Sequence, residues 1–217
     1  MISRRDLLIL APIAPLAAVA AAPKEPEVTA TEDLMREHGV LRHVLLVYSE
    51  SAPKIRAGEK VDPTALLQAA RLFKRFGEEY HENLLEEKHI FPIVRKMKGE
   101  AASYPDILEV QHKRGREITA YILGGASGAP LAHALETMVR MYEHHAARED
   151  TIVFPAWKKN FSDKQLDAIA DEFEDIEKKM FGHDGFEDAE QTISKIEKAL
   201  GLADLSRFTA PAPPAAR

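Results

Sequence analysis

Residues 80–92 read Y-H-E-N-L-L-E-E-K-H-I-F-P, and residues 145–155 read H-A-A-R-E-D-T-I-V-F-P. The two segments resemble each other, because each places a glutamate, Glu86 or Glu149, five residues before a Phe-Pro pair. Apolar residues recur around both at spacings of three and four, as on one face of a helix. Together they predict two related helices that carry polar groups among their apolar residues.

An imidazole accompanies each glutamate, but at a different spacing. His145 and Glu149 are four residues apart and share one helix face, one turn from each other. His81 and Glu86 are five residues apart, which turns the two side chains about 140° from each other in a regular α-helix. A one-residue π-bulge between them would return both to one face. The five-residue spacing therefore predicts a distorted helix if both side chains point inward.

The rest of the chain has the same helical periodicity. From Thr31 onward no window alternates in the manner of a strand, and short Gly or Pro interruptions separate the helices. Pro53, Pro92 and Pro155 are expected to kink or end their helices. The sequence predicts an all-α domain of four main helices and an extra helical hairpin. The main helices are expected at Glu32–Ala57, Pro63–Met97, Asp106–Leu123 and Leu131–Phe161, and the hairpin helices at Ser162–Phe181 and Gly185–Leu200.

Each main helix places a histidine in its apolar seam: His38, His81, His112 and His145. If the helices run alternately up and down, the four lie within about 12 Å of one level, at about 1.5 Å per residue. One such histidine is most simply a hydrogen-bonded core residue. Four of them with nearby carboxylates are costly to bury unless they satisfy one another or a metal. Because the chain has no cysteine, any metal is held by His and carboxylate.

These motifs resemble the hemerythrin-like (HHE cation-binding) family. Besides residues 80–92 and 145–155, the segments L-M-R-E-H-G-V-L (34–41) and Q-H-K-R-G-R (111–116) occur in the family's order, so the resemblance covers about residues 32–161. It implies an up-down four-helix bundle that encloses a non-haem di-iron site. Carried over by position, the two glutamates are the bridging candidates, and the implied metal ligands are His38, His81, Glu86, His112, His145 and Glu149.

Two positions depart from the family pattern. The histidine and glutamate of the second helix are usually four residues apart, so Glu82 is an additional or substitute ligand candidate beside Glu86. Arg116 stands where blood-type hemerythrins have a second histidine on the third helix. A guanidinium cannot bind iron, so the site is expected to have fewer histidines than an oxygen carrier. Two roles are open for Arg116: stabilising an anionic peroxide, or pairing with a carboxylate such as Glu82 or Glu86.

Composition narrows the function classes. The chain has 29 basic and 35 acidic residues and a formal net charge of -6, which disfavours nucleic-acid binding. It shows no Ser/His/Asp arrangement and no phosphate loop. With the resemblance, we expect a protein with two iron ions that binds or reduces a small oxidant (O2, peroxide or NO), with an electron donor that the sequence does not identify. An enzyme of this kind would have peroxidase or catalase-like activity; the alternatives are an iron-storage or oxygen-sensing module and a structural bundle that binds a protein partner.

The N-terminus resembles an export signal. Residues 3–8 read S-R-R-D-L-L, like a twin-arginine signal, and the apolar stretch 7–22 that follows is too short to span a bilayer. Ala18-Val19-Ala20 supplies a cleavage site, which predicts a signal peptide over 1–20, a periplasmic location and no stable membrane insertion after cleavage. A Sec signal or an uncleaved anchor is the alternative. The remaining chain is expected to divide into the bundle (31–161), the accessory hairpin (162–201) and a disordered tail (202–217).

Overall fold

The computed structural model describes residues 28–214, and every regular element in this range is helical. The first and second helices of the bundle are joined by a short loop. Thr29 caps α1 (Ala30–Arg56) by accepting the N–H of Glu32, and Asp62 caps α2 (Pro63–Leu72) with a proline in the first turn. Pro53 lies inside α1 and does not end it, since the helix continues to Arg56.

The second and fourth bundle helices each change their winding where they carry the motif glutamates. The chain passes from α2 into the π-helix η1 (Phe73–Ile90) and then into α3 (Phe91–Val94). After the 3₁₀ turn η2 (Glu100–Ser103) and α4 (Pro105–Leu123), the fourth helix comprises α5 (Gly128–Arg148), the π-turn η3 (Glu149–Val153) and α6 (Phe154–Lys158). The predicted distortion between His81 and Glu86 is confirmed, and it extends over 18 residues instead of one bulge.

The Phe-Pro pairs explain both π segments. The N–H of Phe91 bonds to the carbonyl of Glu86, and the N–H of Phe154 bonds to that of Glu149, so each contact spans five residues. The following proline has no N–H, and its ring would clash with the carbonyl four residues earlier in a regular helix. A wider turn relieves this clash, and Pro92 and Pro155 then occupy the first turn of α3 and α6. The sequence analysis missed the second π-turn.

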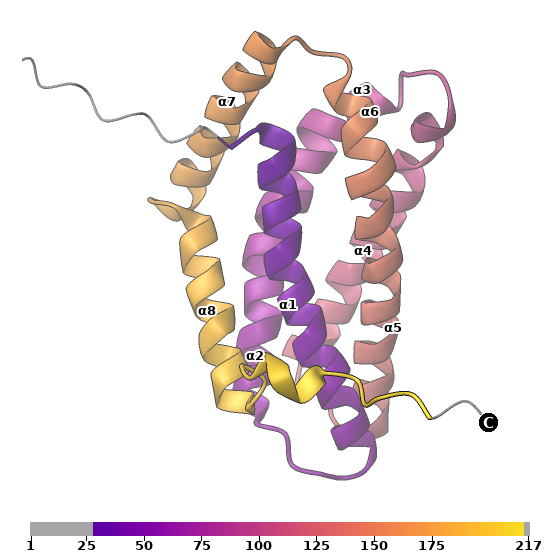
Figure 1. The fold of residues 1–217 in the computed structure, drawn as a ribbon, viewed down its shortest axis with the longest axis vertical. Coiled ribbons are helices and arrows are strands. Elements are labelled where there is room, and N and C mark those ends of the chain that lie inside the picture. The colour runs from indigo at the N-terminus through magenta and orange to yellow at the C-terminus, as the bar shows by residue number, and fades with distance from the viewer. Residues whose placement is uncertain (1–27, 215–217) are drawn as a thin grey trace, which may run out of the picture.

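The four helices form a bundle whose neighbours run up and down alternately (Figure 1). α1 packs on α5 and η1, and α4 packs on the other side of the bundle against η1 and α5. Large side chains fill the interior above and below a central polar layer; Tyr48, Phe73, Phe91, Phe154 and Trp157 are among those fully buried. The layer is therefore enclosed by apolar side chains at both ends.

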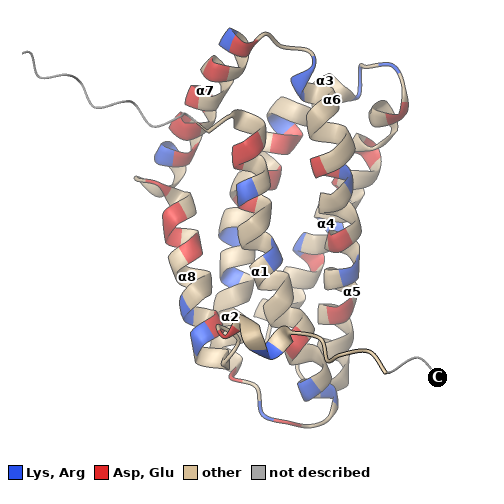
Figure 2. Ribbon diagram, in the orientation of Figure 1, with Lys and Arg blue, Asp and Glu red and all other residues tan. Residues whose placement is uncertain are grey.

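The accessory hairpin comprises α7 (Asp163–Phe181) and α8 (Gly185–Leu200), and it packs against α1, α2 and η1. Its buried side chains are mostly apolar, among them Leu166, Phe173, Ile193 and Ile196, but they include Glu177. Acidic residues are frequent along both helices (Figure 2). Beyond it, the tail predicted to be disordered contains a 3₁₀ turn, η4 (Leu205–Phe208). Among the described residues, no helix is long and apolar enough to cross a membrane. The predicted signal peptide lies outside residues 28–214.

Candidate metal centre

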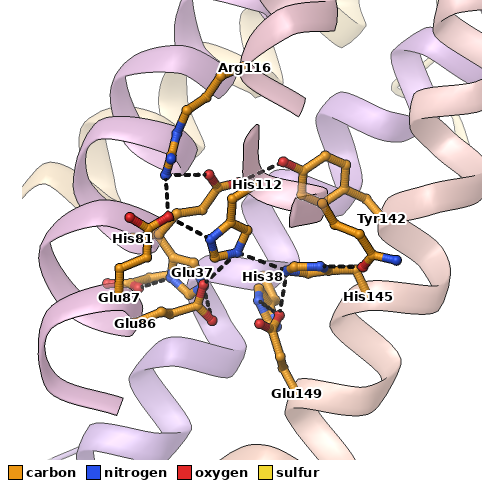
Figure 3. Close-up of polar contacts among 12 residues, drawn as sticks. Glu37, His38, His81, Glu86, Glu87, His112, Arg116, Tyr142, His145 and Glu149 are labelled. Atoms are coloured by element: carbon orange, nitrogen blue, oxygen red, sulfur yellow. Dashed lines mark hydrogen bonds and ion pairs between the residues drawn. The ribbon is translucent and has the colours of Figure 1, made fainter. Parts of the chain in front are cut away.

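Four imidazoles meet in the middle of the bundle, one from each main helix (Figure 3). His38 comes from α1, His81 from η1, His112 from α4 and His145 from α5, and none is more than 3% exposed. They form two pairs: the ring centroids of His38 and His81 are 4.6 Å apart, and those of His112 and His145 are 4.8 Å apart. The structure thus brings together the four histidines that the sequence places inward.

Glu86 and Glu149 lie between the imidazole pairs and each reaches both. The two oxygens of Glu86 are 3.3 Å from Nε2 of His81 and 3.3 Å from Nε2 of His112. Oε2 of Glu149 is 3.0 Å from Nε2 of His145 and 3.5 Å from Nε2 of His38. Each carboxylate therefore faces one imidazole of each pair, which is the position of a bridging ligand.

The chemistry of this donor set fits metal ions. All four oxygens of Glu86 and Glu149 are fully buried and have no hydrogen-bond partner among the described residues, and neither has Nε2 of His81. Buried carboxylates without partners are costly, and a cation is the usual remedy. Donor atoms within 4.8 Å of one another occur in three overlapping groups: Glu86, His112, His145 and Glu149; His38, His81 and Glu86; and Glu82, Glu87 and His112. Imidazole and carboxylate together suit iron and similar ions.

A ring of outer contacts fixes the four imidazoles through Nδ1. Each partner adjoins a ligand in sequence and reaches the imidazole of the next helix. The contacts are Glu37 to His81 (2.5 Å), Glu87 to His112 (2.9 Å), Gln111 to His145 (2.9 Å) and Asp150 to His38 (2.6 Å). Such contacts orient Nε2 towards the metal position and raise ligand basicity. The sequence analysis missed these four residues, although their adjacency to ligands could have indicated them.

Without a metal, the centre holds protons strongly. Burial opposes charging of His81, but the charge of Glu86 and the hydrogen bond to Glu37 outweigh it and raise the pKa of His81 well above 6.5. The pKa of His112 is raised in the same sense, against burial, by Glu82, Glu86 and Glu87. Although burial opposes it, the nearby His145 and His38 lower the pKa of Glu149 well below its usual range. A metal ion therefore binds in competition with protons on the imidazoles.

Glu82 and Arg116 lie beside the centre and contact each other. Nη2 of Arg116 donates to Glu82 (3.1 Å) and to Glu87 (2.7 Å), and the hydroxyl of Tyr142 donates to the other oxygen of Glu82 (2.7 Å). Gly115 allows this arrangement, because a Cβ there would come 2.0 Å from the Tyr142 hydroxyl oxygen. The structure thus places Glu86, not Glu82, between the imidazoles, and it pairs Arg116 with Glu82 but not with Glu86.

A small cavity adjoins the centre on the side of α1 and α5. Its lining combines the candidate ligands His38, His81, Glu86 and His145 with the polar residues Arg42, Glu82 and Tyr142 and with the hydrophobic residues Leu41, Leu45 and Ala146. The free space is about 10 Å³, which admits about one water-sized molecule. This space is too small for an organic substrate of ordinary size.

Comparison with known proteins agrees with this geometry. The model of the hemerythrin HHE cation-binding domain matches residues 29–157. Uncharacterised proteins of Mycobacterium bovis and Mycobacterium tuberculosis are each 40% identical to the chain over 195 residues, covering 86% of this chain and 76% of theirs. No solved structure matches significantly. The chain belongs to the family of proteins with a hemerythrin HHE cation-binding domain.

Proposed function

We propose that the chain is a non-haem di-iron protein that binds or reduces a small oxidant: O2, peroxide or NO. Family membership makes it a cation-binding protein. Two imidazole pairs that share two buried carboxylates offer donors for two metal ions. When bound, a pair of iron ions supplies two electrons, one from each ion.

The small cavity beside the centre is the main observation that supports this proposal. It is bordered by ligand side chains, it holds about one water-sized molecule, and its other walls are largely apolar. The size excludes bulky substrates and favours a diatomic molecule or peroxide.

The residues of the chain have separate tasks in this function. Glu86 and Glu149 hold both metal positions, and the outer partners keep the imidazoles in the required tautomer. Glu82 faces the cavity and is fixed there by Tyr142 and Arg116. Arg116 contacts Glu82, which lines the cavity. Its positive charge is therefore placed to stabilise negative charge on an oxidant bound in the cavity.

Metal analysis of the native protein tests the proposal. We expect about two irons per chain, the number held by ferritin-like di-iron bundles. His145→Ala is expected to lose much of this iron. His144→Ala is the matched control, because the adjacent His144 is exposed and contacts Arg148 instead. Native protein without iron would favour a structural bundle that binds a partner.

The reaction with oxidant distinguishes the remaining alternatives. Stopped-flow absorbance of the reduced, iron-loaded protein should show rapid oxidation by peroxide and repeated turnover when a reductant is present. Reversible binding of O2 or NO without turnover would indicate a sensing module. Iron that accumulates beyond the two sites would indicate storage.

We also propose that the protein is exported to the periplasm after folding. The ligands come from four helices, so the site exists only in the folded chain, and a folded-protein export route permits iron loading before export. Replacing Arg4 and Arg5 together by Lys should retain the precursor in the cytoplasm. Normal export of this double variant would instead favour a Sec route and metal loading outside the cell.

A further inference from the structure

A second hollow lies between η1 and α4, and Arg116, which contacts Glu82 beside the centre, forms part of its lining. Arg116, Glu78 and Thr119 line it, together with Lys74, Glu79 and Asn83. Unlike the small cavity between α1 and α5, it is open to solvent and bordered by charged and polar groups. It therefore offers water a path to the residues behind the metal centre.

Two buried polar groups in this hollow, Glu78 and Thr119, have at most each other as partners. Glu78 is only 4% exposed and Thr119 is fully buried. Thr119 lies close enough to lower the pKa of Glu78, but neither Oε1 of Glu78 nor Oγ1 of Thr119 makes a hydrogen bond of normal geometry among the described residues. The hydroxyl of Tyr48, which lies near Glu78, is in the same condition. Polar atoms kept buried and unpaired are costly and suggest a task other than stability.

Glu78 continues a line of carboxylates that leads inward. Glu78, Glu82 and Glu86 follow one another at four-residue intervals along η1 and are all buried. A π-helix has slightly more than four residues per turn, so these side chains stay near one face. Glu82 lines the small cavity, and its partner Arg116 lines the hollow. The pair Glu78 and Glu82 thus connects the solvent side to the oxidant side.

The surroundings of Glu78 suit a group that exchanges a proton near neutral pH. Burial and the charge of Glu82 raise its pKa to about 7, while Thr119, Lys74 and Arg116 act in the opposite direction. The two tyrosines that also face it, Tyr48 from α1 and Tyr142 from α5, remain neutral because their pKa values are raised.

We propose that Glu78 is the proton-uptake residue of the centre and passes protons from water in the hollow towards the cavity past Glu82. The inference rests on the proposed function. Reduction of one H2O2 to two water molecules consumes two electrons, supplied by oxidation of two ferrous ions to ferric ions, and two protons. For each proton, the Glu78 carboxyl releases H⁺ inward and is protonated again by water in the hollow.

Glu78→Gln in the full-length, iron-loaded protein tests this route. Glu79→Gln is the matched control, because Glu79 lines the same hollow but is half-buried and paired with Lys74 and Arg75. We expect normal iron content in both variants and oxidation by peroxide about 100-fold slower in Glu78→Gln alone, the lower end of the range for loss of a proton-transfer group. Glu78→Asp, which keeps an acid, should restore part of the rate.

Infrared titration of the iron-free protein gives a readout independent of activity. Two carboxyl groups, Glu78 and Glu177, are expected to titrate near pH 7, so the protonated-carboxyl band in that range should lose about half of its intensity in Glu78→Gln and nearly all of it in the double variant Glu78→Gln, Glu177→Gln. If the unmodified protein reacts with peroxide and Glu78→Gln reacts equally fast, the route is overturned and the proposed function stands. If the unmodified, iron-loaded protein does not react with any of the three oxidants, the proposed function fails and the proton route fails with it.

Discussion

The two halves of the metal centre use the same ligands but differ in what supports them. In the first half, both imidazoles have a carboxylate behind them: Asp150 behind His38 and Glu37 behind His81. In the second half, His112 has Glu87 behind it, but His145 has the neutral amide of Gln111. The first half therefore has one more negative charge in contact with its imidazoles.

The arginines near the two halves do not cancel this difference in the number of carboxylate contacts. Arg42 pairs with Asp150 in the first half, and Arg116 pairs with Glu87 in the second, so one carboxylate of each half is balanced. Glu37 contacts no arginine; the hairpin brings Glu177 near it, and their mutual repulsion contributes to the raised pKa of Glu177. A carboxylate behind a ligating imidazole increases its donor strength. The charge of Glu82 also acts on His112, but Glu82 makes no hydrogen bond to an imidazole among the described residues. If each half holds a metal ion, we expect the His38 and His81 half to hold it more strongly, because more carboxylates hydrogen-bond to its imidazoles.

Removing a candidate ligand that both halves share should release metal from both halves. Glu86 faces one imidazole of each half, so Glu86→Gln is expected to release most of the iron from both. Glu82→Gln is the matched control, because Glu82 lies one turn earlier, is equally buried and is fixed by Arg116 and Tyr142. Iron content of the purified variants measures the effect. Equal losses in the two variants would show that Glu82 also acts as a ligand.

Removing the charge of one outer partner and adding a charge at another should reverse which half binds its metal ion more strongly. Glu37→Gln removes the extra charge from the first half, and we expect its metal affinity to fall about 10- to 100-fold, as is usual for such contacts. Gln111→Glu adds a charge to the second half and should strengthen it. Chelator competition resolves a strong and a weak site in each variant. Unchanged affinities in both variants would contradict the ranking of the two halves.

Replacing Arg116 tests whether the charge beside the second half affects the reaction with peroxide. Arg116→Ala should leave iron content near normal and slow oxidation by peroxide about fivefold, corresponding to ~1 kcal/mol for a partly exposed charge contact. Arg114→Ala is the control, since Arg114 is exposed and pairs only with Glu117 among the described residues. An unchanged rate would remove Arg116 from the reaction, and loss of iron would show that its role is structural.

The smallest expected effect concerns the acidic residues that the hairpin places near the first half. Burial raises the pKa of Glu177 from 4.5 to about 7, so the folded chain binds its proton more tightly than the unfolded chain. This stabilisation is complete below about pH 4.5 and is lost as the pH rises to about 7. Glu177→Gln should therefore raise the free energy of unfolding by ~1 kcal/mol at pH 8 and by little at pH 4.5.

Thermal unfolding at several pH values measures this difference. Glu174→Gln is the control, because Glu174 is exposed on the same helix and pairs with Lys178. A stability difference between Glu177→Gln and the unmodified chain that does not change with pH would show that Glu177 is ionised without cost, which would weaken the argument for a negative field behind His81.

The helices and the inward histidines were predictable because they follow local rules. Periodicity placed His38, His81, His112 and His145 on apolar faces, and the five-residue step from His81 to Glu86 required a distortion. The second π-turn had the same Phe-Pro pair, but His145 and Glu149 already share a face in a regular helix, so their spacing gave no indication of it. The outer partners escaped notice because single polar residues next to a ligand are common on helix surfaces.

The sequence by itself determined the helical architecture, the six ligand candidates, the family resemblance and the lack of thiolate ligands, since these depend on residue identity and spacing. Only the tertiary structure decided which glutamate lies between the imidazoles, which partner supports each one and that Arg116 pairs with Glu82 and Glu87. It also decided that a small cavity borders the centre and that Glu82 and Arg116 lie between this cavity and a solvent-open hollow. Those properties depend on how four helices are rotated and staggered against one another, and this arrangement arises from the packing of the whole core, which no local spacing encodes.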